Sequence, residues 1–179
     1  MKRNAWSPRT GRLGAFLLAF TLLLAGPAGA QELEGFWDDP FKDLQADVEQ
    51  AESEGKAGVF AFFEMDECPF CHRMKTQVFT DPEVQSYIKE NLVTVSIDIE
   101  GDVMMTDPDG EQLKEKAFAF DRYRVRATPV MIFFDTDGEP AVRYTGPTHT
   151  PGEFIKLMEF FVSGAYDEPG MNFFKYKKQ

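Results

Sequence analysis

The stretch Gly58–His72, GVFAFFEMDECPFCH, decides the fold of this chain of 179 residues. Its first eight residues, Gly58–Met65, are apolar except for Glu64, which predicts a strand that is buried on both faces. Cys68 follows three residues after this run, and residues 70–78 favour a helix. A cysteine pair with the spacing Cys-x-x-Cys therefore lies between a buried strand and the start of a helix.

Cys68 and Cys71 are the only cysteines in the chain. In the first turn of a helix their spacing puts both sulfurs within reach of one bond. The free N–H groups and the positive dipole end of the helix favour a thiolate on the first sulfur, and the thiolate is the attacking species in disulfide exchange. We expect Cys68 to be the nucleophile and Cys71 the resolving thiol. Pro69 suits the first turn because its missing N–H would have no partner there.

The same residues allow two other interpretations. Together with His72, the cysteines spell Cys-x-x-Cys-His, the attachment motif of a c-type haem, which would make the protein an electron carrier. A purely structural disulfide is the other interpretation, but a bond that closes so small a loop removes little chain entropy. The adjoining strand favours redox chemistry, because c-type cytochromes are usually helical. The sequence predicts no metal site and no cofactor, and it leaves the haem alternative open.

The N-terminus indicates export. Four basic residues and no acidic residue precede an apolar run over residues 15–25. Ala28-Gly-Ala30 then has the small-x-small pattern of a signal-peptidase site. We expect a signal peptide over residues 1–30 that is cleaved after Ala30, and a single domain over residues 31–179. An uncleaved membrane anchor is the alternative, although the run is short for a span. Export would allow an oxidised cysteine pair to persist.

The expected mature chain is strongly acidic. Without residues 1–30 it keeps 15 basic and all 30 acidic residues, which gives a net charge of −15 at pH 7. Such a surface repels the phosphate backbone, so we expect no nucleic-acid partner.

Helices and strands alternate along the rest of the chain. Helices are expected from Asp39-Pro40 to Gly55, from Thr80 to Leu92, over residues 111–123, and from Thr150 onward. Strands are expected over residues 93–99 and 130–134, the latter paired with residues 141–144 in a hairpin, while residues 100–110 form a loop or small insertion. This order predicts an α/β fold with a mixed central sheet, helices on both faces, and a C-terminal hairpin plus helix.

Two further features are candidates for the site. Thr128-Pro129 precedes the strand at residues 130–134. If this bond is cis, the backbone of Thr128 can face an incoming peptide, and an ordinary trans edge proline is the alternative. A buried carboxylate at Glu64, near Cys71, could move a proton as a mixed disulfide is resolved, unless the strand ends there and leaves Glu64 solvated. Substrate contacts are assigned to Thr128, Pro129, Pro69 and Phe70.

These motifs resemble the thioredoxin superfamily, and more closely the periplasmic SoxW-type thioredoxins that are associated with bacterial sulfur-oxidation gene clusters. The similarity covers about residues 39–170. It is carried by Phe63-Glu64 before the cysteine motif and by five other stretches, TDPEV at 80–84, DIEGD at 98–102, TDPDGE at 106–111, YRVRATP at 123–129 and FFDTDG at 133–138.

The resemblance implies a thioredoxin-like fold in which a cis-proline, matched by Pro129, faces the redox pair. It also implies a soluble exported reductant that receives electrons from a membrane thiol transporter and passes them to oxidised periplasmic proteins. Ordinary thioredoxins carry a buried aspartate six residues before the first cysteine, where this chain has Phe62, so Glu64 is expected to take its role. Because a histidine like His72 also follows the second cysteine in exported disulfide isomerases, isomerase or oxidase activity is the alternative.

Overall fold

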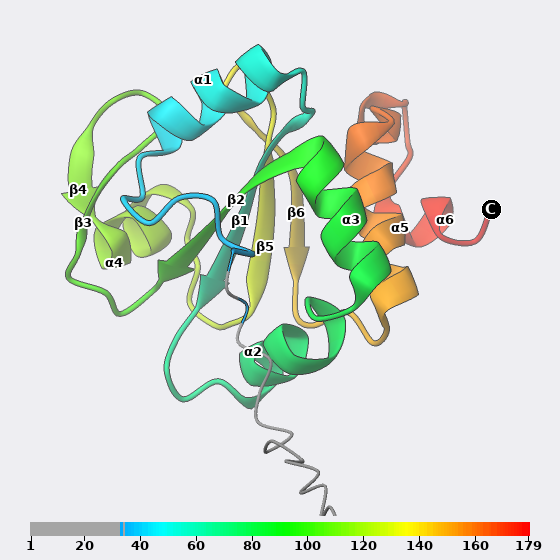
Figure 1. Cartoon of the computed structure of the whole chain (residues 1–179), viewed down its shortest axis with the longest axis horizontal. Coiled ribbons are helices and arrows are strands. Elements are labelled where there is room, and N and C mark those ends of the chain that lie inside the picture. Colours follow the sequence, from blue (N-terminus) through cyan, green and yellow to red (C-terminus); the bar gives the residue numbers. More distant parts are fainter. Residues whose placement is uncertain (1–32, 34) are drawn as a thin grey trace, which may run out of the picture.

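The computed structural model describes residues 33 and 35–179, so the expected signal peptide and its cleavage site lie outside the described residues. A four-stranded sheet with the order β2-β1-β5-β6 forms the centre (Figure 1). β1 runs parallel to β2 and antiparallel to β5, and β6 pairs antiparallel with β5, which confirms the predicted mixed sheet and hairpin. The strands are β1 (Gly58–Glu64), β2 (Leu92–Asp98), β5 (Val130–Phe134) and β6 (Pro140–Thr145).

Helices cover both faces of this sheet, as the sequence predicts (Figure 1). One face carries α2 (Pro69–Arg73), α3 (Pro82–Asn91) and α5 (Pro151–Val162), and the other carries α1 (Leu44–Glu54) and α4 (Glu115–Ala117). Alternate residues of β1 enter the two cores, because successive side chains of a strand point to opposite faces. Six of the seven residues of β1 are therefore buried, and Glu64 alone is partly exposed.

Phe79 joins the elements of the larger core, which is the one that contains the cysteines. Its ring is fully buried. The ring centroid lies 5.0 Å from that of Phe62 in β1, 5.2 Å from that of Phe154 in α5 and 4.9 Å from that of Phe36 in the N-terminal segment. The strand that leads to Cys68 is thus held against α5 and the N-terminal segment by one aromatic cluster.

The first helix begins later than predicted. α1 starts at Leu44, because the carboxylate of Asp39 accepts hydrogen bonds from the backbone N–H groups of Phe41 at 2.6 Å and Asp43 at 2.5 Å and so fixes a turn before the helix. Asp43 is the N-cap residue, and its side chain accepts from the N–H of Ala46. Phe41 lies outside the helix and is exposed. The predicted end at Gly55 is confirmed, with a left-handed φ of 70°.

The segment predicted as a loop at residues 100–110 contributes to a small antiparallel hairpin. Its strands are β3 (Met104–Thr106) and β4 (Gln112–Lys114), so the helix expected over residues 111–123 shrinks to α4 and the π-helical turn η2 (Phe118–Arg122). Buried Glu115 ties the hairpin to the sheet, since its carboxylate pairs with Lys42 and accepts from the N–H of Asp98 at 3.0 Å.

The remaining helix starts agree with their capping signals. Asp81 accepts from the N–H groups of the first turn of α3, and Thr150 accepts from that of Glu153 in α5.

The π-helical turn η1 (Met74–Val78) extends α2. The C-terminal tail folds back through η3 (Ala165–Asp167) and α6 (Phe173–Tyr176), where Phe173 is buried. Among the described residues, no helix is both long enough and apolar enough to cross a membrane.

Candidate active site

The two cysteines form a disulfide at the N-terminus of α2. Cys68 is the N-cap residue, with extended φ and ψ of −119° and 94°, and Cys71 lies one helical turn later, with the two Cα atoms 5.2 Å apart. The backbone N–H of Cys71 donates a hydrogen bond to the Sγ of Cys68 at 3.0 Å. Pro69 occupies the first helical position. The structure thus pairs the sulfurs within one turn, as their spacing predicts.

The two sulfur-bearing residues differ in their access to the surface. Cys71 is only 1% exposed and packs in the core cluster that contains Phe62 and Met74. Cys68 is 5% exposed and lines an open surface depression, whose other lining residues are Asp66, Glu67, Pro69 and His72. Cys68 therefore lies at the depression, while Cys71 is buried in the core.

Phe70 stands between the cysteines in sequence and points its ring into solvent, with 55% of its surface exposed. A large exposed aromatic side chain beside a reactive group offers apolar contact area to a partner. The assignment of Phe70 to substrate binding stays a prediction.

Thr128-Pro129 reaches the same end of the sheet as the cysteine pair. The peptide bond between these residues is cis, and the carbonyl of Pro129 accepts from the N–H of Gly146 at 2.9 Å. The next residue, Val130, pairs with Phe63 at the end of β1 from which the chain continues to Cys68. The buried Oγ1 of Thr128 has no hydrogen-bond partner among the described residues.

Glu64 ends β1 on the sheet face that carries the cysteines, since it alternates with Phe60 and Phe62. Its carboxylate accepts from the Oγ of Ser96 at 2.6 Å and pairs with the Nζ of Lys75 at 2.5 Å, and its side chain is 16% exposed. Neither alternative predicted from the sequence describes this carboxylate fully, because it is neither isolated in the core nor freely solvated.

Sequence reasoning did not single out Ser96 or Lys75. Ser96 reaches Glu64 through the parallel register in which it lies opposite Phe62, and register is not readable from either strand alone. Lys75 follows Cys71 by four residues, a spacing that places the two on one side of a helix. That periodicity is the one signal that could have pointed to Lys75.

The segment after Cys71 is anchored to the loop that precedes α5. The guanidinium of Arg73 donates to the carbonyls of His149 at 2.8 Å and Thr148 at 3.4 Å. This contact holds α2 against the loop without using a side chain of the depression.

The described part of the chain contains no group of three or more His, Cys, Asp or Glu residues arranged to bind a metal ion.

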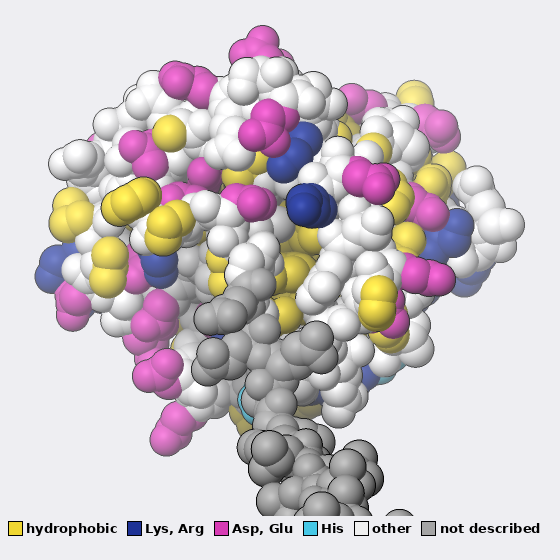
Figure 2. Space-filling view, viewed as in Figure 1, with side chains coloured by type: hydrophobic (Ala, Val, Ile, Leu, Met, Phe, Trp, Pro, Cys, Tyr) yellow, Lys and Arg dark blue, Asp and Glu magenta, His cyan; other side chains and the backbone are white. Residues whose placement is uncertain are grey.

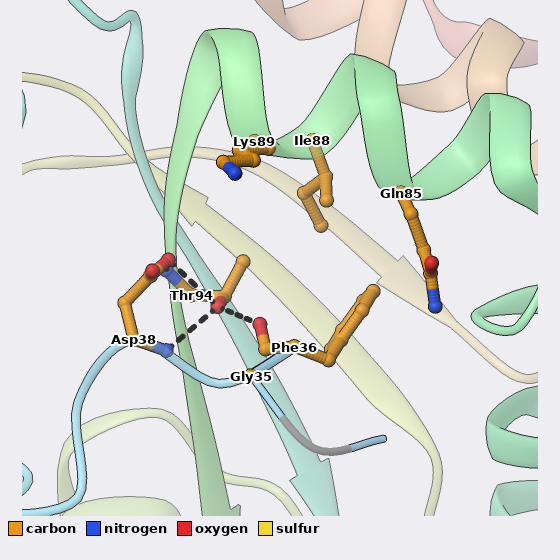
Figure 3. Close-up of a pocket in the computed structure, with 7 residues that line it drawn as sticks. All are labelled: Gly35, Phe36, Asp38, Gln85, Ile88, Lys89 and Thr94. Carbon is orange, nitrogen blue, oxygen red and sulfur yellow. Dashed lines mark hydrogen bonds between the residues drawn. The ribbon is translucent and has the colours of Figure 1, made fainter. Parts of the chain in front are cut away.

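A second cavity of about 240 Å³ lies between the N-terminal segment and α3 (Figure 3). Its polar wall is a structural network, in which the Oγ1 of Thr94 donates to the carbonyl of Phe36, while the carboxylate of Asp38 accepts from the N–H of Thr94 at 3.0 Å. Gln85, Ile88 and Lys89 form the side contributed by α3. These bonds fasten the N-terminal segment to β2, which is a structural role. We assign the reactive chemistry to the cysteine pair.

Asp47 is a buried acid on the opposite face of the sheet from the cysteines. It lies in α1 and is 4% exposed. Burial, followed by the charge of Asp39, raises the pKa of Asp47 to about 8, and its buried Oδ2 has no hydrogen-bond partner among the described residues. This carboxyl is therefore protonated at neutral pH in the folded protein, although it has no part in the cysteine site.

Comparison with known proteins also indicates a thioredoxin-like fold. Residues 44–161 match the model of a family described as a thioredoxin-like domain. Comparison with curated proteins finds no match. Solved structures with a similar fold include three in which the match covers most of the neighbour's chain. They are a thioredoxin-fold protein from Helicobacter pylori (20% identity, TM-score 0.62, 83% of this chain and 89% of that one), a putative disulphide-isomerase from Bacteroides thetaiotaomicron (25%, 0.52, 67% and 88%) and a thioredoxin from Thermus thermophilus (25%, 0.50, 72% and 87%).

Proposed function

We infer that this chain, which belongs to the thioredoxin-like domain family, is a thiol–disulfide oxidoreductase. The observation that carries this conclusion is the disulfide between Cys68 and Cys71 at the start of α2, with Cys68 at a surface depression and Cys71 buried behind it. Such a pair takes up two electrons and two protons when the disulfide becomes a dithiol, and it returns them when the disulfide forms again.

In the reduced protein, the thiolate of Cys68 attacks a substrate disulfide, and one substrate sulfur leaves as a thiolate. The thiolate of Cys71 then attacks the sulfur of Cys68 in the mixed disulfide, which releases the second substrate thiol and restores the protein disulfide. The N–H of Cys71, which donates to the Sγ of Cys68, supports negative charge on the attacking sulfur. Two electrons pass to the substrate in each cycle.

We assign the proton transfer of the second step to Glu64. Its carboxylate lies on the cysteine face of the sheet and is held by Lys75 and Ser96. A carboxylate fixed in this way can accept the proton that Cys71 must lose before it attacks. Phe62, which occupies the position of the usual aspartate, is fully buried among aromatic rings and cannot accept a proton.

We assign the substrate backbone to Thr128 and Pro129, and further contacts to Pro69 and Phe70. The register of β5 with β1 supports this assignment, because it brings Thr128-Pro129 to the end of the sheet from which the chain continues to Cys68. The exposed ring of Phe70 adds apolar contact area beside the depression.

We further propose that the protein acts in the periplasm as a reductant of oxidised exported proteins, with a role in sulfur oxidation. A membrane thiol transporter would supply its electrons. The support is the basic and apolar leader, with cleavage after Ala30, together with the resemblance to SoxW-type thioredoxins. Disulfide isomerase or oxidase activity is the second candidate, favoured by the structural neighbour described as a putative disulphide-isomerase.

Two assays test this function. With dithiothreitol as the electron source, the protein should accelerate the reduction of insulin disulfides, and Cys68→Ser should abolish that acceleration. A haemochrome absorbance spectrum of protein purified from its periplasm should show no covalent haem, because the disulfide already uses both sulfurs of the motif. Turnover absent in the wild type, or a haemochrome band, would overturn the proposal. A measured reduction potential then separates a reductant from an oxidase.

A further inference from the structure

We propose that the depression beside Cys68 selects disulfides flanked by basic residues, so that the natural partners of this protein carry Lys or Arg next to the reacting cysteine. This inference rests on the proposed function, and it names the substrate class of the same site.

Two carboxylates border the sulfur that a substrate must reach. Asp66 and Glu67 line the depression together with Cys68, and both are exposed. Neither forms an ion pair with any described residue. Figure 2 shows acidic side chains at the lower left of the face in view, where Figure 1 places the segment that joins β1 to α2.

The cations of the adjoining helix do not offset these charges. The guanidinium of Arg73 is directed to the carbonyls of Thr148 and His149, and the ammonium of Lys75 pairs with Glu64. His72 completes the lining of the depression. In the loop that precedes Pro129, Arg126 lies over the exposed ring of Phe120, 5.0 Å from its centroid. Lys42, which lines a neighbouring hollow with Asp66 and Lys75, pairs with Glu115. The depression therefore presents to a substrate two carboxylates that have no ion-pair partner.

The chemistry of exchange brings a substrate close to these charges. A new sulfur–sulfur bond to Cys68 requires covalent contact, so the residues on either side of the substrate cysteine must lie next to Asp66 and Glu67. A basic side chain there is attracted and an acidic one is repelled, which changes the rate of productive encounter. Because both carboxylates are exposed, the preference is modest, about tenfold between basic and acidic substrates at low ionic strength, and it weakens with salt.

The test uses three short peptides with the same internal disulfide and with Lys, Gln or Glu on both sides of each cysteine. The protein is first reduced with dithiothreitol, freed of reductant, and mixed with each peptide. Oxidation of the protein dithiol is followed as the peptide dithiol appears. The ratio of the second-order rate constant for the Lys peptide to that for the Glu peptide cancels any change in the reactivity of the shared thiolate. It is measured for the wild type, for D66N/E67Q, and for E49Q/E52Q.

Glu49 and Glu52 are the matched control, because both are exposed on α1, which packs on the opposite face of the sheet from the cysteines. We expect a ratio of about ten in the wild type and the control at low ionic strength, a ratio near one in D66N/E67Q, and a fall in the wild-type ratio on addition of salt. A wild-type ratio near one, or a ratio that D66N/E67Q leaves unchanged, would overturn the inference. Failure to reduce even the Gln peptide would instead overturn the proposed function.

Discussion

Replacement of Asp47 by Asn should make the stability of this protein much less sensitive to alkaline pH. Asp47 is almost fully buried in α1, and burial, followed by the charge of Asp39, raises its pKa from 3.8 to about 8. The ionised carboxyl is disfavoured there, because its buried Oδ2 has no hydrogen-bond partner among the described residues. An Asn side chain has nearly the same shape and is uncharged at every pH.

The size of the effect follows from proton linkage. Between the two pKa values the folded chain holds the proton of Asp47 and the unfolded chain has lost it, so the folded state binds more protons. The contribution of this group to stability is therefore fully present below about pH 4, decreases as the pH rises, and levels off above about pH 8. Each pH unit inside this window changes the free energy of unfolding by about 1.4 kcal/mol, so a rise from about pH 5 to pH 8 removes about 4 kcal/mol.

Urea unfolding of the oxidised protein at several pH values between about 5 and 9 measures this loss. We expect the free energy of unfolding of Asp47→Asn, relative to the wild type, to increase by about 4 kcal/mol across the window. Glu49→Gln, an exposed substitution on the same helix, should run parallel to the wild type. If the curves for Asp47→Asn and the wild type are also parallel, then Asp47 is ionised in the folded protein and the reasoning is wrong.

Three other substitutions test separate parts of the structure. Glu64→Gln should slow the resolution of the mixed disulfide at neutral pH by about tenfold or more in stopped-flow experiments, and an unchanged rate would remove its proton role. Phe79→Ala should lower the free energy of unfolding by about 3–5 kcal/mol in urea, because it empties the centre of the aromatic core, and a loss below about 1 kcal/mol would contradict that position. Gly58→Ala should destabilise the protein by more than about 2 kcal/mol in the same assay, since its Cβ would lie 2.0 Å from the carbonyl oxygen of Phe134, and wild-type stability would be the contrary result.

The elements of this fold were predictable where local chemistry specifies them. The apolar run of β1, the helix start at Thr150, and Gly55 at the end of α1 each act through their immediate neighbours, and each prediction is confirmed. The start of α1 was predicted wrongly, because Asp39 looks like an N-cap but caps the turn that precedes the helix. The β3–β4 hairpin was missed because two strands of three residues leave too short a pattern to recognise.

The candidate site likewise combines features that the local sequence predicts with features that depend on tertiary contacts. The pairing of Cys68 with Cys71 follows from their spacing at a helix start, which is local information. The environment of Glu64 depends on Ser96 from a neighbouring strand and on Lys75 from the π-helical turn, and neither contact is encoded near Glu64 in the sequence. The burial of Asp47 and its interaction with Asp39 likewise depend on the turn that precedes α1, and the predicted helix start at Asp39 did not include that turn.

The central claim is that Cys68 attacks the substrate and Cys71 resolves the mixed disulfide. Reduced Cys71→Ser should therefore accumulate a covalent adduct with insulin, and mass spectrometry of its peptides should place the bond at Cys68. Reduced Cys68→Ser should accumulate far less, because Cys71 is buried behind the depression. An adduct that forms equally well through Cys71, or no adduct from Cys71→Ser together with a wild type that does not reduce insulin, would contradict the account.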